Sequence, residues 1–85
     1  MITFNINDEN DFEVMNSLEL LEISAANCLG SKIREEKLNI NKFKLQVSGG
    51  KIRIIVNGED NIDDCVKNCY ILKNLKFDII IKYEK

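Results

Sequence analysis

Hydrophobic and polar residues alternate in four short stretches of the chain. These stretches cover residues 1–7, 42–47, 51–56 and 77–83. Successive side chains of a strand point to opposite faces of a sheet, so a period of two predicts four half-buried strands. Gly49 and Gly50 separate the second stretch from the third. Because glycine adopts a positive φ without steric cost, this pair predicts a β-hairpin.

Two other stretches carry a helical period. Between Val14 and Cys28 the apolar residues recur in steps of three and four, which predicts an amphipathic helix that packs on a core. We expect Asp8 to cap the start of this helix, and Gly30 to stop or kink it before a short further turn. A second helix is predicted after a cap at residue 60 or 61. Its predicted inward face consists of Ile62, Cys65, Val66, Cys69 and Leu72.

The order of elements is therefore β-α-β-β-α-β, which belongs to the α+β class. The default arrangement for this order is the ferredoxin-like one, an antiparallel sheet with two helices on one face. We expect residues 1–85 to form a single domain. The span between the first two strands is long for one crossover, which predicts an extra turn or loop between Gly30 and Asn41. This fold hosts many functions and indicates none by itself.

The sheet face that the helices leave open is predicted to be polar, with two exceptions. Ile55 and Ile80 fall on that face. They form either a patch that docks a partner or two scattered apolar residues of the ordinary kind. Arg53 lies on the same face with other bases that could meet phosphates. Direct nucleic-acid binding is not expected, because the net charge is −2 and no aromatic residue falls on this face.

Charge is unevenly distributed along the chain. Residues 1–40 hold eight acidic and three basic residues, whereas residues 41–85 hold six acidic and nine basic ones. In the first predicted helix Glu13, Glu19 and Glu22 have no basic residue nearby in the sequence. They form either an acidic surface that fits a basic cleft or a solvated helix face.

The sequence lacks the usual machinery of catalysis. It contains no histidine, no phosphate-binding glycine loop and no calcium loop, so we expect a protein that is not an enzyme and has no metal or cofactor site. Its three cysteines include Cys65 and Cys69 on one helix face. They form either half of a zinc site or, as we expect, buried reduced thiols without a disulfide framework.

These observations favour a non-enzymatic protein that binds a larger protein or nucleoprotein complex. Small size, an acidic first half and a composition rich in Asn, Lys and Ile are typical of phage-encoded inhibitors of host defence, such as anti-CRISPR proteins, although no motif is shared. The candidate contact residues are Glu13, Glu19, Glu22, Arg53, Ile55 and Ile80. The alternative is a small regulatory or ligand-binding module of ferredoxin-like fold that acts as a homodimer.

The expected location is the cytoplasm, which would be the host cytoplasm for a phage protein. Residues 1–10 contain neither a basic region nor an apolar signal core. No apolar run approaches the roughly 18 residues of a membrane span. We therefore expect no membrane partner.

Overall fold

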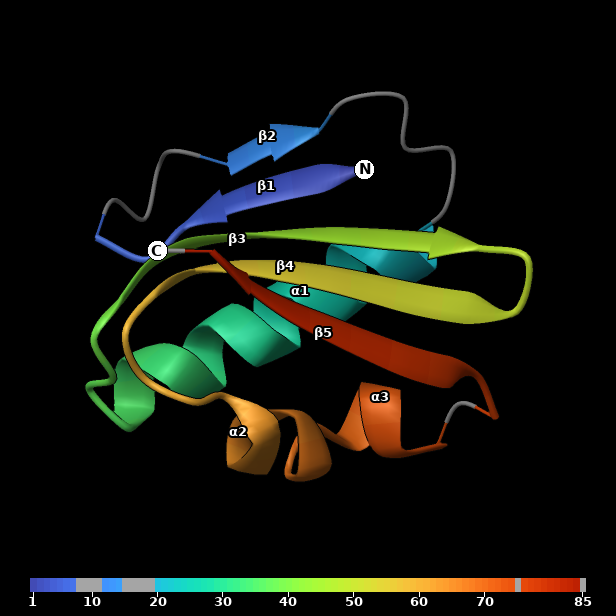
Figure 1. Ribbon diagram of the computed structural model, residues 1–85. Coiled ribbons are helices and arrows are strands. Elements are labelled where there is room, and N and C mark those ends of the chain that lie inside the picture. Colours follow the sequence, from blue (N-terminus) through green and yellow to red (C-terminus); the bar gives the residue numbers. More distant parts are fainter. Residues whose placement is uncertain (8–11, 15–19, 75, 85) are drawn as a thin grey trace.

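A computed structural model describes residues 1–7, 20–74 and 76–84 of the chain, and residues 12–14 by their backbone. In this part of the chain one sheet lies against one layer of helices (Figure 1). The elements are β1 (Ile2–Asn5), β2 (Phe12–Val14), α1 (Leu20–Glu35), β3 (Ile40–Ser48), β4 (Lys51–Gly58), α2 (Asp63–Lys67), α3 (Tyr70–Asn74) and β5 (Asp78–Glu84). None of the described helices is long and apolar enough to cross a bilayer.

The sheet is mixed, and its strands follow the order β2-β1-β3-β4-β5. Neighbouring strands are antiparallel except for β4 and β5, which are parallel. The α+β class is confirmed, whereas the ferredoxin-like order with its antiparallel sheet is not. The chain passes through α2 and α3 after β4 and returns beside β4 in the same direction, as crossover connections do.

The predicted hairpin is confirmed. Strands β3 and β4 pair in register from Ser48 opposite Lys51 as far as Lys42 opposite Asn57. Gly49 and Gly50 connect them with φ values of 58° and 74°. Two successive positive φ values match the right-handed twist of the flanking strands, which explains the glycine pair.

The first helix differs from its prediction at both ends. Phe12–Val14, whose last residue was assigned to that helix, is the strand β2, and it pairs with β1 through Ile2 and Val14. The expected cap Asp8 lies outside the described residues. Gly30 does not stop the helix, because α1 continues to Glu35. A side chain at Gly30 would lie 2.5 Å from the ring of Phe4, so glycine serves close packing here.

A left-handed residue ends α1. Lys37 has a φ of 53°. Its N–H donates to the carbonyl of Arg34 at 3.1 Å, and the N–H of Leu38 donates to the carbonyl of Ile33 at 3.3 Å. These two bonds form a Schellman motif. The long span between Gly30 and Asn41 is thus filled by the rest of α1 and its cap, and not by a separate turn.

The second predicted helix is divided into α2 and α3 at Asn68 and Cys69. Its predicted inward face is nevertheless buried at all five positions. Near its start Asn61 Oδ1 accepts a hydrogen bond from the N–H of Asp63 at 2.7 Å. Asp60 instead accepts from the N–H of Asn39 at 2.6 Å and so ties this loop to the start of β3.

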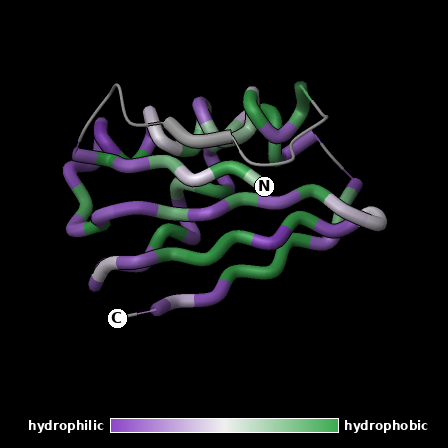
Figure 2. The backbone as a smooth tube through the Cα atoms, turned by 90° about the horizontal axis from the view of Figure 1, so that it is seen from above, coloured by the Kyte–Doolittle hydropathy of each residue, from purple (hydrophilic) through white to green (hydrophobic). Residues whose placement is uncertain are grey.

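The core lies between the sheet and the helices. Hydrophobic and hydrophilic positions alternate along the strands, and the helices gather on one side of them (Figure 2). The rings of Phe4 and Phe43 stack with centroids 5.3 Å apart. The guanidinium of Arg34 lies 4.8 Å from the Phe4 ring centroid and donates to the carbonyls of Asn5 and Ile6. This arginine therefore fixes the end of α1 to the end of β1.

Candidate functional site

The sheet face that points away from the helices carries the predicted contact residues. Strand register places Arg53 directly between Gln46 and Ile80, and Ile55 directly between Lys44 and Lys82. Ile80 exposes 44% of its surface, and Ile55 is partly buried. Arg53, Ile55 and Ile80 therefore lie close together on β4 and β5, with the isoleucines as diagonal neighbours.

Basic side chains adjoin these two isoleucines. Among the side chains that the structure describes, five on this face are basic, namely Lys42, Lys44, Lys51, Arg53 and Lys82, and all five are exposed. Two acidic ones, Asp78 and Glu84, lie along β5. We call the five bases together with Ile55 and Ile80 the basic sheet face. The protein is acidic overall, but this face carries an excess of positive charge.

Lys42 and Lys51 were not singled out by sequence reasoning. The signal was present, because alternation along each strand places Lys42 beside Lys44 and Lys51 beside Arg53 on one face. The net charge of the whole chain does not reveal this local concentration of basic residues on one face. A field over a few strands depends on the nearest charges, since screening limits its range to about 8 Å at physiological salt.

The predicted acidic surface on the first helix is not formed as expected. Glu22 is buried, with 4% of its surface exposed. Its Oε2 accepts a hydrogen bond from the N–H of Val47 at 3.3 Å and lies 3.4 Å from the amino group of Met1. Glu22 is therefore a structural residue and not a contact for a partner. Glu13 lies in β2 opposite Thr3, and the structure describes only its backbone. Glu19 lies outside the described residues.

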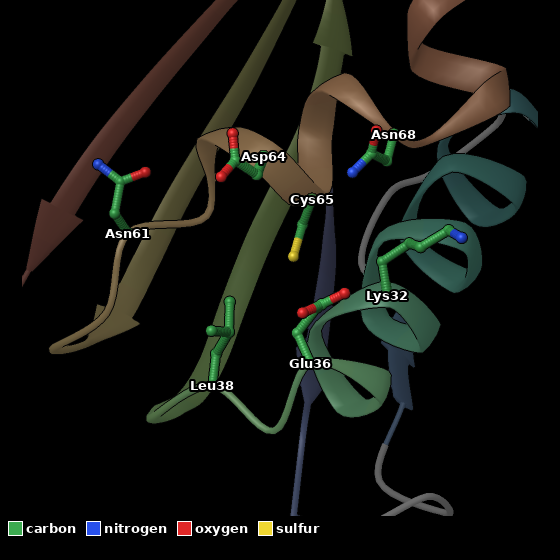
Figure 3. Close-up of a pocket in the computed structure, with 7 residues that line it drawn as sticks. All are labelled: Lys32, Glu36, Leu38, Asn61, Asp64, Cys65 and Asn68. Atoms are coloured by element: carbon green, nitrogen blue, oxygen red, sulfur yellow. The ribbon is translucent and has the colours of Figure 1, made fainter.

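A small polar pocket lies on the opposite side of the molecule, between the end of α1 and α2 (Figure 3). It encloses about 250 Å³ and is lined by Lys32, Glu36, Leu38, Asn61, Asp64, Cys65 and Asn68. Burial raises the pKa of the Cys65 thiol, and the carboxylates of Glu36 and Asp64 raise it further. A thiol with a raised pKa is a poor nucleophile at neutral pH, so Cys65 is not an activated nucleophile.

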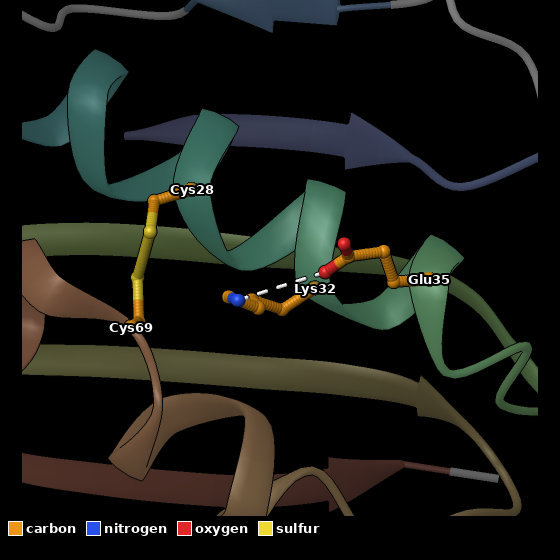
Figure 4. Close-up of a disulfide and its surroundings, with 4 residues drawn as sticks. All are labelled: Cys28, Lys32, Glu35 and Cys69. Carbon is orange, nitrogen blue, oxygen red and sulfur yellow. Dashed lines mark ion pairs between the residues drawn. A yellow bond between two sulfur atoms is a disulfide. The ribbon is translucent and has the colours of Figure 1, made fainter.

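Two of the three cysteines form a crosslink that the sequence did not predict. A disulfide joins Cys28 of α1 to Cys69 between α2 and α3, with Cα atoms 6.1 Å apart, while Cys65 is free and buried (Figure 4). The prediction of three reduced thiols is therefore wrong for two of them. A sequence separation of 41 concealed the proximity of the bonded cysteines, since only the packing of the helices brings them together.

The molecule thus has two different sides, a basic sheet face and a helical side with the pocket and the disulfide. Among the described residues no group of three or more His, Cys, Asp or Glu could hold a metal ion. The chain matches no known family model, and neither the curated proteins nor the solved structures compared with it gave a match.

Proposed function

We propose that this protein is a non-enzymatic binding protein whose basic sheet face docks on an acidic surface of a larger protein. The observation that supports this most directly is the position of Ile55 between Lys44 and Lys82, with Ile80 beside Arg53 at the edge of the sheet. Interfaces commonly combine an apolar centre with a charged rim, and arginine is enriched among the residues that contribute most to affinity.

Charge and hydrophobicity have separate roles in this proposal. The lysines would speed association with an acidic partner and make it sensitive to salt. The isoleucines would supply the apolar contact that excludes water from the centre. Truncation of a central residue of this kind costs roughly 1–2 kcal/mol of binding free energy.

A protein partner fits this face better than a nucleic acid does. Folds that bind single-stranded nucleic acid on an open sheet use aromatic side chains as stacking platforms. The described residues at the centre of the face are isoleucine, arginine and lysine. Isoleucine can fill an apolar contact with a protein but offers no ring on which a base can stack.

A small phage-type inhibitor of a host defence complex is the class of protein that we propose on grounds of size and composition. Such an inhibitor would act through the basic sheet face. An inhibitor that acts through an acidic first helix is less well supported, because Glu22 is buried against Met1 and Val47.

The test is quantitative capture of partners from a nuclease-treated host lysate. The bait is wild type or a variant of the face that carries Lys44→Ala and Arg53→Ala, both of which lie away from the β5 edge. A matched control carries Lys67→Ala and Lys73→Ala, which change exposed bases on α2 and α3. We expect one partner to be captured by wild type and by the control, and to be reduced at least about tenfold with the face variant.

Equal capture of the same partner by all three baits would contradict the proposal. Two results would indicate a nucleic acid instead of a protein. One is a partner that is captured from untreated lysate but not from nuclease-treated lysate. The other is a mobility shift of labelled DNA or RNA near physiological salt that Arg53→Ala abolishes.

A further inference from the structure

Strand β5 is an open edge of the sheet. It pairs with β4 on one side, and no described strand lies on its other side (Figure 1). With seven residues, Asp78–Glu84, it offers a long row of backbone groups. Natural proteins usually cover such edges or interrupt them, because an uncovered edge can pair with another chain.

The helix layer covers β5 incompletely. The core-side residues of β4 are fully buried, whereas Ile79 and Ile81 of β5 are only partly buried and Tyr83 exposes 40% of its surface. A groove of about 490 Å³ lies beside Ile79, with Val66 and Leu72 among its lining residues. Apolar surface is therefore left open along this edge on the helix side, while Ile80 is exposed on the other face.

We infer that β5 pairs with β5 of a second copy of this chain, antiparallel and centred on Ile80. A two-fold axis through Ile80 would join the two sheets into one and keep both helix layers on the same side. The facing pairs within β5 would be Ile80 with Ile80, Ile79 with Ile81 and Asp78 with Lys82. Extension of the strand by two residues would add Phe77 with Tyr83 and Lys76 with Glu84.

Every facing pair in this register is complementary. Asp78 meets Lys82 and Lys76 meets Glu84, so each opposite-charge pair occurs twice across the axis. The aromatic residues meet each other and the isoleucines meet each other. Opposite charges, aromatic pairs and β-branched pairs are the cross-strand combinations that stabilise antiparallel strands.

Neighbouring registers do not share this complementarity. A shift that centres the axis on Ile81 places Asp78 opposite Glu84, and one that centres it on Ile79 places Lys76 opposite Lys82. Like charges directly opposite each other destabilise a sheet. If the axis instead passed between two residues, each residue whose side chain points to the core would face one whose side chain points to the open face. The charge pattern of residues 76–84 therefore favours one self-pairing.

This pairing goes beyond the proposed docking function and does not depend on it. It would place two basic sheet faces side by side around Ile80, and so present a doubled surface to an elongated acidic partner. The dimer itself is tested without any partner, which keeps the two proposals separate.

The test exchanges charges across the predicted axis. Lys82→Asp alone would place two acids opposite each other, and Asp78→Lys alone would place two bases opposite each other. We expect each single variant to be monomeric by sedimentation velocity, with its dimer dissociation constant raised at least tenfold over wild type. The double variant is expected to dimerise again. An equimolar mixture of the two singles is expected to form a heterodimer.

Lys44→Asp is the matched control, since it reverses a charge on β3 of the same face but away from the edge. It is expected to dimerise like wild type. Circular dichroism melts check that each variant is folded, which matters because Asp78 also neighbours Lys51 within the chain. A folded wild type that stays monomeric at millimolar concentration would overturn the inference. Single variants as dimeric as wild type, or folded singles that fail to pair with each other, would overturn it equally.

Discussion

Gly30 in α1 and Lys37 just after it both depart from the conformation that their residue types favour. Gly30 looks like a helix stop, but it lies inside the helix because the ring of Phe4 occupies the space of a side chain. Lys37 looks like an ordinary polar residue, but it takes the left-handed conformation at the helix end. The contact at Gly30 comes from tertiary structure, which a single sequence does not display, whereas the dihedral at Lys37 belongs to the local cap of the helix.

At Lys37 the replacement Lys37→Gly is expected to stabilise the protein by about 1 kcal/mol. A left-handed conformation costs a residue with a Cβ roughly 1–2 kcal/mol. Glycine avoids this cost, but it loses more conformational entropy on folding than lysine does, and this offsets part of the gain. Urea unfolding measures the change, with Lys37→Ala as the control that keeps the Cβ. A glycine variant no more stable than the alanine variant would show that the cap has another conformation.

At the scale of elements, the disulfide and Tyr83 hold the helix layer. The disulfide connects α1 to the link between α2 and α3. The hydroxyl of Tyr83 in β5 accepts a hydrogen bond from the N–H of Ile62 at 3.1 Å, just before α2. These two contacts anchor short helices that could not persist alone, since isolated helices below about 12 residues are marginal in water.

Loss of the disulfide is expected to lower the free energy of unfolding by about 4 kcal/mol, the chain-entropy value for a loop of this length. Cys28→Ser measures this in urea, and Cys65→Ser is the control that leaves the bond intact. Thiol titration of unreduced, denatured wild type should find one reactive cysteine, because Cys65 is the free one. Three reactive thiols would contradict the crosslink.

The contribution of Tyr83 is expected to depend on pH. Burial raises the pKa of its hydroxyl above the ordinary value of 10.0. The neutral phenol is therefore favoured in the folded state, so its contribution is complete below pH 10 and is lost as the pH rises through the folded pKa.

Tyr83→Phe is accordingly expected to cost about 1 kcal/mol at pH 7, because the N–H of Ile62 loses its acceptor. The difference from wild type should shrink in urea unfolding at about pH 11. Tyr70→Phe changes an exposed tyrosine and is expected to have little effect at either pH. A cost for Tyr83→Phe that stays constant with pH would argue against this role.

At the scale of the whole molecule, the sequence predicted the faces of the strands better than their order. Alternation correctly placed Arg53, Ile55 and Ile80 on the open face, because the period of two follows from backbone geometry. The order and direction of the strands depend on which edge the chain reaches after each crossover. Alternation carries no information on that choice, so β2 and the parallel pairing of β5 were missed.

The candidate surface was predictable in part for the same reason. The isoleucines and Arg53 could be assigned to one face, and the lysines around them follow the same register. The burial of Glu22 could not be foreseen, because its partners are the amino group of Met1 and the N–H of Val47, which are distant in sequence. A glutamate on a helix occupies the same place in the sequence pattern whether its carboxylate faces solvent or accepts a hydrogen bond from a backbone amide.

We propose that a partner binds the basic sheet face of the whole molecule. Acetylation of lysines, read by mass spectrometry in the free protein and in complex with the partner captured by wild type, tests this binding mode. We predict that Lys42, Lys44 and Lys51 become protected in the complex, while Lys67 and Lys73 on the helical side react as before. Protection of Lys67 and Lys73 with unchanged reaction at Lys42, Lys44 and Lys51 would contradict it.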